Sequence, residues 1–158
     1  MLFRISILFT LFAAVACKNN EQQFTEQEKA LIADTIRQTL NNYYADIRKE
    51  GLLAEFRYLD SSSEFFWVPP GFENALNYDS IHSILIKNAS SLSSIVNSWE
   101  NLAIHPLSRE LVNYTGKIRS TVTDTAGNVF NSTLLETGIM IRRKNGWKLL
   151  SGQTAVIK

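Results

Sequence analysis

Apolar residues recur at intervals of three or four early in the chain, which is the spacing of one helix face. The stripe consists of Ile32, Ile36, Leu40, Tyr43 and Ile47. Thr25 and Glu28 precede it with the spacing of a capping box, in which each side chain satisfies an amide of the first turn. Gly51 is a suitable residue to end a helix. The pattern therefore predicts a helix over residues 26–50.

The middle of the chain predicts shorter elements. A further helical turn is expected over residues 52–58. Residues 65–68, Phe-Phe-Trp-Val, favour a short strand, which the Pro-Pro-Gly of 69–71 ends. Asp79 can cap a second helix that runs over residues 79–89.

From residue 92 onward the pattern changes from helical to alternating. Strands are predicted over residues 95–107, 111–123 and 129–143, with a turn at 124–127. The alternation is clearest in the second of these strands. Its apolar face carries Val112, Tyr114, Ile118 and Val122.

The last hairpin sets the expected register. Residues 144–146, Lys-Asn-Gly, favour a three-residue loop with Gly146 in the left-handed region, which places Arg143 opposite Trp147. A two-residue Asn-Gly loop is the alternative, but it pairs a polar with an apolar residue. The preferred register places alternate residues of the two hairpin strands on the inner face of the sheet: Leu135, Thr137, Ile139, Ile141, Trp147, Leu149, Ser151 and Gln153. It places the intervening residues on the outer face of the sheet: Glu136, Met140, Arg142, Lys148 and Leu150.

Helices followed by long antiparallel strands predict an α+β fold, with the helices packed on one face of a curved sheet. No internal repeat or second domain is evident. We therefore expect one domain over residues 25–158.

Composition narrows the function classes. In 158 residues, 45% are hydrophobic, which excludes a disordered chain. The 16 basic and 15 acidic side chains nearly cancel, so charge does not favour a nucleic-acid partner. One cysteine and two histidines support neither a disulfide scaffold nor a zinc site. We expect no metal and no cofactor.

The first residues read as an export signal. Arg4 precedes an apolar run over residues 5–15, whose length of about 16 Å is too short to span a bilayer core of about 30 Å. Ala14-Val15-Ala16-Cys17 resembles the bacterial lipobox. The resemblance implies a signal peptide over residues 1–16, a lipid on Cys17 and a tether over 17–24. The alternative is a signal in which the cysteine is incidental.

The resemblance to a lipobox also predicts where the protein is located in the cell. Lipidated cysteines anchor proteins in the bacterial cell envelope, because several acyl chains give stable membrane binding. In enteric bacteria an aspartate after the cysteine marks retention in the inner membrane. Lys18 stands there, so we expect the outer membrane.

The order of elements resembles the nuclear transport factor 2-like superfamily, specifically its SnoaL-like branch. The likeness rests on the long first helix, the strand before Pro-Pro-Gly, strand 111–123, the Asp-x-x-Gly turn and the hairpin 142–150, and covers roughly residues 25–157. The resemblance implies a cone: a strongly curved antiparallel sheet packed on N-terminal helices, also called cystatin-like, with a pocket at one end. It further implies a homodimer through the sheet.

The resemblance also bears on catalysis. Isomerase-like members use a first-helix tyrosine, for which Tyr43 or Tyr44 stands, and an aspartate whose position falls at Phe66 or Trp67. SnoaL-like members often carry His-x-His where this chain has Ser151-Gly152-Gln153. Both acid and base positions are therefore filled by residues that cannot transfer protons. This favours binding of a small apolar molecule over turnover, and no catalytic residue is assigned.

The expected pocket follows from alternation and the family resemblance. It is formed by Tyr44, Trp67, Tyr114, Ile139, Leu149, Ser151 and Gln153. An isomerase, lyase or hydrolase remains an alternative, and it requires an ionisable group inside the cone. An assembly module is another, and it requires a plugged cavity and an exposed apolar face around Met140 and Leu150. We interpret Asp60 as a solvated acidic residue of a turn and His105 as an exposed histidine. We interpret Glu136 as a surface residue that forms an ion pair.

Overall fold

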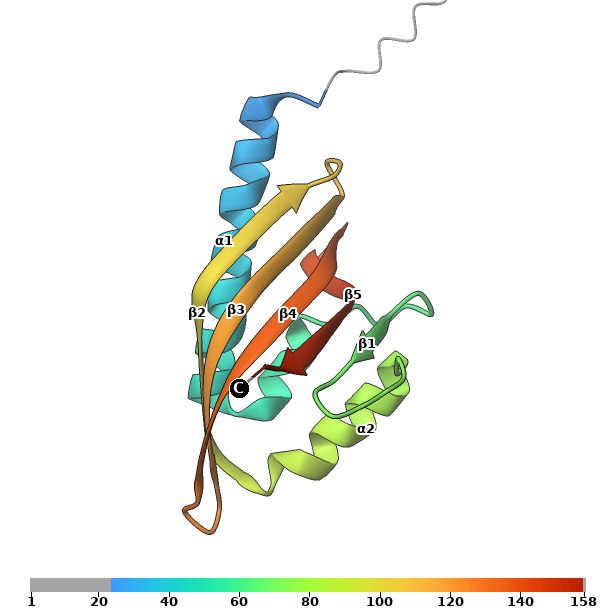
Figure 1. Cartoon of the computed structure of the whole chain (residues 1–158). Helices are drawn as coiled ribbons and strands as arrows, with labels where there is room; N and C mark the ends of the chain where they lie inside the picture. The colour runs from blue at the N-terminus through green and yellow to red at the C-terminus, as the bar shows by residue number, and fades with distance from the viewer. Residues whose placement is uncertain (1–23, 158) are drawn as a thin grey trace, which may run out of the picture.

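A computed structural model describes residues 24–157, so the predicted signal peptide, Cys17 and most of the predicted tether lie outside the described part. The chain forms helices first and strands afterwards (Figure 1). The elements are α1 (Glu26–Glu50), the 3-10 helix η1 (Leu52–Arg57), β1 (Phe66–Val68), α2 (Tyr78–Ala89), β2 (Leu92–Pro106), β3 (Leu111–Asp124), β4 (Val129–Arg143) and β5 (Gly146–Val156). No helix in residues 24–157 is long and apolar enough to cross a membrane.

The start of α1 has the expected capping box. The Glu28 amide donates to the Thr25 hydroxyl over 3.2 Å, and the Thr25 amide donates to the Glu28 carboxylate over 2.9 Å. The helix ends at Gly51, whose φ of 88° suits glycine. Its buried face is Ile36, Leu40, Tyr43, Tyr44 and Ile47. The predicted stripe is therefore confirmed from Ile36 to Ile47, with Tyr44 added to it, whereas Ile32 is only partly buried.

The strands form one sheet in the order β1-β5-β4-β3-β2. The four long strands pair antiparallel, and the short β1 joins the β5 edge in parallel. In Figure 1 the sheet curves, with α1 lying along one face of it and α2 near one end. The predicted α+β class with a curved sheet on N-terminal helices is confirmed.

The helix α2 begins slightly earlier than the sequence suggested. Its cap is Asn77, whose side-chain oxygen accepts a hydrogen bond of 3.0 Å from the Ser80 amide. Asp79 instead lies in the first turn, where its charge favours the positive end of the helix. Ile81 and Leu85 are buried, as expected for the inward face.

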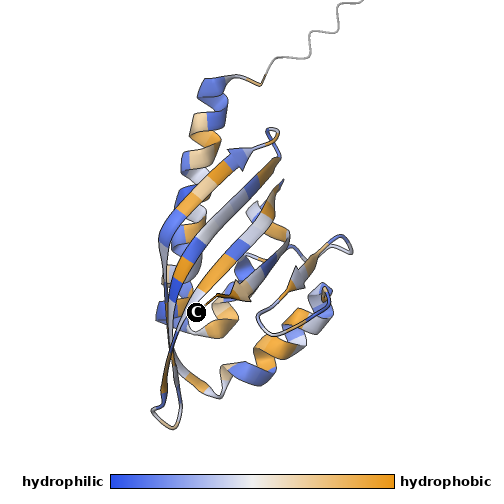
Figure 2. Cartoon of the chain, in the orientation of Figure 1, coloured by the Kyte–Doolittle hydropathy of each residue, from blue (hydrophilic) through white to orange (hydrophobic). Residues whose placement is uncertain are grey.

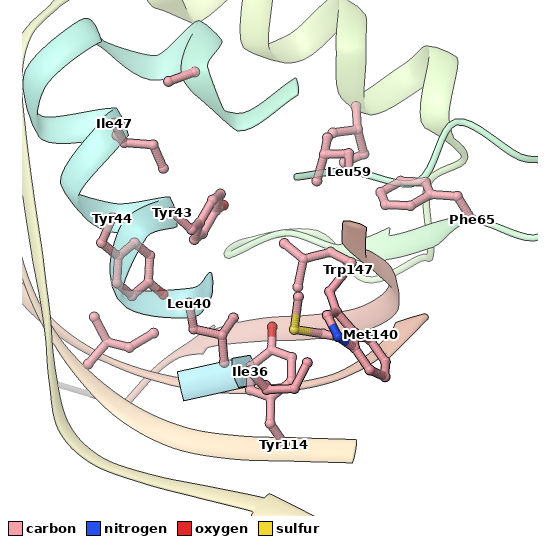
Figure 3. Packing of buried hydrophobic residues seen from close by; sticks show 14 of the residues in the cluster. Ile36, Leu40, Tyr43, Tyr44, Ile47, Leu59, Phe65, Tyr114, Met140 and Trp147 are labelled. Atoms are coloured by element: carbon pink, nitrogen blue, oxygen red, sulfur yellow. The ribbon is translucent and has the colours of Figure 1, made fainter. Parts of the chain in front are cut away.

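The core lies between α1 and the concave side of the sheet. Figure 3 shows Ile36 and Leu40 of α1 facing Tyr114 and Met140 of the sheet, and all four are at most 1% exposed. Along the strands, hydrophobic and hydrophilic positions alternate in Figure 2. The alternation predicted for strand 111–123 is confirmed, because Val112, Tyr114 and Ile118 are fully buried.

The register predicted for the last hairpin is wrong near its turn. The loop has two residues, Lys144 and Asn145, and Arg143 pairs with Gly146, whose φ is 108°. Met140 therefore lies opposite Leu149, and both are buried. The face around Met140 is not an exposed apolar surface.

A β-bulge then shifts the pairing. Met140 pairs with Leu149, but Ile139 pairs with Ser151, so Leu150 is the extra residue on β5. Beyond the bulge, Thr154 lies opposite Glu136, and both are buried. A glutamate expected on the outer surface therefore lies on the inner face of the sheet.

Candidate functional site

A cavity of about 340 Å³ lies between the helices and the inner face of the sheet. This volume is at the small end of the range for small-molecule sites, about 300–1,000 Å³. Most of its wall is apolar or aromatic, including Leu52, Phe65, Trp67, Phe72, Ile81, Ile84, Leu85, Leu92, Ile95, Val122, Leu134 and Leu149. Its polar groups come from Tyr43, Tyr44, Glu55, Asn88, Asn97, Ser120, Glu136 and Thr154.

Glu136 is the buried centre of a hydrogen-bond network. Its carboxylate accepts bonds from the hydroxyls of Tyr114 over 2.8 Å, Thr154 over 3.0 Å and Tyr44 over 3.4 Å. The side chain is only 6% exposed. Burial raises the pKa of Glu136 above its usual value, although these three donors oppose the rise.

Two glycines make room for this network. Gly116 lies opposite Glu136 and Gly138 lies opposite Tyr114, so between β3 and β4 neither side chain has another side chain directly across from it. Tyr114 and Glu136 are therefore diagonal neighbours, a separation that an aromatic side chain can bridge.

Trp67 extends the network toward the edge of the sheet. Its indole nitrogen donates to the Thr154 hydroxyl over 3.1 Å, and that hydroxyl donates in turn to Glu136. The indole ring lies over Gly152, where a Cβ atom would come within 2.7 Å of it. The absence of a side chain at this glycine therefore lets Trp67 reach the cavity wall.

Glu55 is a second carboxyl group in the cavity wall, supplied by η1. Burial and the negative charge of Glu136 raise its pKa to about 7, while a hydrogen bond from Tyr43 acts in the opposite direction. The group is thus divided between its charged and neutral forms near pH 7. Burial and nearby carboxylates also raise the pKa values of Tyr43 and Tyr44 well above the usual value for tyrosine. Both hydroxyls therefore stay protonated and can donate hydrogen bonds.

The cavity wall carries no Lys, Arg or His among the described residues. It also contains an acceptor without a partner in the described part of the chain, the buried side-chain oxygen of Asn97. The described wall therefore has two carboxyl groups, one unpartnered acceptor and no basic side chain. No group of three or more His, Cys, Asp or Glu within residues 24–157 could hold a metal ion.

The structure brings together part of the expected pocket. Tyr44, Trp67 and Leu149 line the cavity. Tyr114 is fully buried and reaches the site through its hydrogen bond to Glu136.

The remaining three expected residues do not line the cavity. Ile139 and Ser151 pair with each other, and Gln153 follows on the same side of β5. They alternate with Gly152 and Thr154, whose positions face Trp67 and Glu136. Because of the bulge at Leu150, these three lie on the opposite face of the sheet.

Other candidates also differ from expectation. Asp60 is 6% exposed and pairs with Arg143 outside the cavity, so it is not a solvated turn acid. Glu136 is not a surface ion-pair partner, as its network shows. His105 is exposed, as expected.

Glu55 was not singled out from the sequence at all. It stands between Ala54 and Phe56 in a weakly patterned helical turn, and no recognisable motif includes it. The one local signal is that it directly follows three apolar residues, Leu52, Leu53 and Ala54, in the first turn beyond α1.

No family model matches the chain, and no curated protein matches it. Solved structures do match. A nuclear transport factor 2-like superfamily protein from Salmonella enterica has a TM-score of 0.68 at 14% identity, covering 80% of this chain and 92% of its own. A protein with a cystatin-like fold from Caulobacter vibrioides has a TM-score of 0.62 at 9% identity, covering 79% and 89%.

A third similar structure is an enzyme. A type 2 hexachlorocyclohexane dehydrochlorinase has a TM-score of 0.65 at 11% identity, covering 82% of this chain and 87% of its own. At these identities the likeness establishes the fold. The chain has the nuclear transport factor 2-like fold expected from its sequence.

Proposed function

We propose that this chain is a lipid-anchored protein of the bacterial envelope whose cavity binds a small, largely apolar molecule carrying one polar group. The observation that carries the binding proposal is the cavity itself. Its wall is mostly apolar, and Glu55 and Glu136 both belong to it. Such a site removes an apolar body from water while a few polar groups fix its orientation.

A pair of tryptophan substitutions on α2 tests binding. Ile84 lines the cavity, whereas Ile86, on the same helix, is 51% exposed and does not. Titration calorimetry with cyclohexylmethanol is expected to give saturable binding to the wild type and to Ile86→Trp, but not to Ile84→Trp. Circular dichroism checks that both variants are folded. Equal binding by the two variants would place the ligand elsewhere and overturn the proposal.

The anchor has its own test. Cys17→Ala removes the thiol that would take the lipid, so this variant should leave the membrane fraction and lose labelling by radioactive palmitate. Lys18→Asp is the matched control: it should remain lipidated and, in an enteric host, move to the inner membrane. A Cys17→Ala protein that still fractionates with membranes contradicts the anchor.

Proton transfer is a second candidate function, favoured by the pKa of about 7 that Glu55 has in the cavity. A general base is most effective when its pKa lies near the working pH. Among similar structures, a dehydrochlorinase shares the fold. In this candidate, the ionised Glu55 removes a proton from a bound carbon acid, and a hydroxyl of Tyr44 stabilises the charge that develops.

A nitrobenzisoxazole probe measures this activity directly. The base takes the ring C–H proton, the electrons of that bond form a nitrile, and the N–O bond breaks to release a coloured phenolate. The wild type should exceed the same concentration of acetate, and the rate should rise with pH around 7. Glu55→Gln should abolish the excess, whereas Glu50→Gln, outside the cavity, should keep it. Unchanged turnover in Glu55→Gln rules out the assigned base.

A further inference from the structure

This inference rests on the proposed binding function and specifies its ligand. We infer that the cavity selects a small organic cation, a protonated amine on an apolar body, over neutral and anionic molecules of the same shape. Three features of the cavity wall carry the inference: its uncompensated carboxyl groups, its unpartnered acceptor and its aromatic rings.

The carboxyl groups have no cation beside them. Glu55 and Glu136 both line the cavity, and the described wall residues include no Lys, Arg or His to neutralise them. Buried charges in proteins are normally paired, because an isolated charge loses its hydration without compensation. A ligand ammonium group would supply the missing partner. An anionic ligand would add a third negative charge to the same space.

The hydrogen-bonding capacity of the wall points the same way. The hydroxyls of Tyr114 and Thr154 already donate to Glu136, so these donors are occupied. The Asn97 oxygen is a buried acceptor with no partner in the described residues. An ammonium group is a donor with no acceptor, so it can donate both to this oxygen and to a carboxylate of the wall.

Aromatic side chains complete the site. Tyr43, Tyr44 and Trp67 all line the cavity, and the rings of the two tyrosines lie with centroids 5.0 Å apart. The faces of tyrosine and tryptophan attract cations, and the apolar body of an amine packs on the same surfaces. The wall thus suits both ends of such a ligand.

The surroundings of Glu55 make its charge responsive to the ligand. The titratable groups that interact with it are Tyr43 and Tyr44 from α1 and Glu136 from β4. From α2, His82 stacks on Phe56 with centroids 4.3 Å apart and is not part of the cavity wall. The wall residues from β5 carry no charge. A bound ammonium group should therefore favour the ionised form of Glu55, and binding should release a proton.

The test compares cyclohexylmethylamine with cyclohexylmethanol, which share one apolar body. On the full chain, calorimetry at pH 8 should show the amine binding about ten- to hundredfold more tightly, as expected for a charge-assisted hydrogen bond in a shielded site. The amine affinity should rise between about pH 5 and about pH 8, where Glu55 ionises, and the alcohol affinity should not. This pH dependence tests the inference without any substitution.

Glu55→Gln should reduce the advantage of the amine to about threefold or less and remove most of its pH dependence. Glu50→Gln makes the same change outside the cavity wall and should leave both unchanged. If amine and alcohol bind equally to the wild type, the cavity binds ligands but the charge selection is wrong. If neither binds, the proposed binding function itself fails.

Discussion

The Tyr114 hydroxyl lies 2.8 Å from a carboxylate oxygen of Glu136, and this contact joins β3 to β4 on the inner face of the sheet. Both side chains are buried, at 0% and 6% exposure. An ionisable group at this depth is stable only while its oxygens are hydrogen-bonded. The network around Glu136 is thus a structural requirement of the fold as well as part of the cavity.

Tyr114→Phe should therefore destabilise the protein. The substitution keeps the ring but leaves Glu136 without its shortest hydrogen bond, which should lower the free energy of unfolding by about 1–3 kcal/mol in urea denaturation. Tyr58→Phe is the matched control. Its hydroxyl donates to Asp46 over 2.6 Å in a partly buried pair, so its loss should cost less, about 1 kcal/mol or below. Equal costs for the two variants would show that the Glu136 network gains nothing from its burial.

Glu55 should make stability fall as the pH rises. Its pKa is about 7 in the folded protein against a usual value of 4.5, so the unfolded chain gives up this proton first. Its contribution is complete below about pH 4.5 and is lost as the pH rises through about 7, a decrease of up to about 3 kcal/mol. Glu136 acts in the same direction, since its pKa is also raised.

Urea denaturation at pH 5 and pH 8 measures this decrease. Glu55→Gln should remove most of it, because the amide does not titrate. Glu50→Gln should retain it, since this residue lies outside the cavity wall. An unchanged pH dependence in Glu55→Gln would mean that the carboxyl is not shielded from water.

The main elements were predictable because each has a local signal. The capping box at Thr25, the helical stripe of α1 and the alternation of β3 depend on near neighbours, and all three appear as expected. Their order predicts the α+β class, and its resemblance to the nuclear transport factor 2-like superfamily implied the particular fold. Local patterns of this kind report which face of an element is apolar.

The site was less predictable because its key positions depend on pairing between strands. The outer face of β4 also carries apolar residues, such as Leu135 at 43% exposure, so alternation alone did not identify the inner face. The short loop before Gly146 and the bulge at Leu150 then decided the positions of Glu136 and Thr154. Neither has a unique sequence signature, and the apolar set was assigned inward by default.

Gly152→Ala should show how closely Trp67 is packed. A Cβ atom at this position would come within 2.7 Å of the indole ring and would also meet the Thr137 carbonyl oxygen, a backbone group that cannot move aside alone. The variant should lose about 2–3 kcal/mol of stability and shift the tryptophan fluorescence. Gly138→Ala is the graded control, because its nearest atoms lie at 3.0 Å, and it should cost less. The opposite order would contradict the packing described for Trp67.

Arg143 holds the buried carboxylate of Asp60, and this ion pair gives the last prediction. The two groups lie 2.5 Å apart, and the Asp60 side chain is 8% exposed. Burial works to raise the pKa of Asp60, but the hydrogen bonds from Arg143 and Ser62 outweigh it and hold this pKa below its usual value. Arg143→Met should cost about 2 kcal/mol at pH 7, because it leaves a buried charge without its partner.

The comparison is Arg119→Met, which removes the arginine of an exposed pair with Glu100. That arginine is 73% exposed, so the loss should stay below about 1 kcal/mol. The stabilisation from Asp60 is present above its unfolded pKa of about 3.9 and is lost as the pH falls through its lower folded value. The difference between wild type and Arg143→Met should therefore shrink as the pH falls below the unfolded pKa of Asp60. A difference that persists in acid would show that Arg143 stabilises the fold through packing and not through its charge.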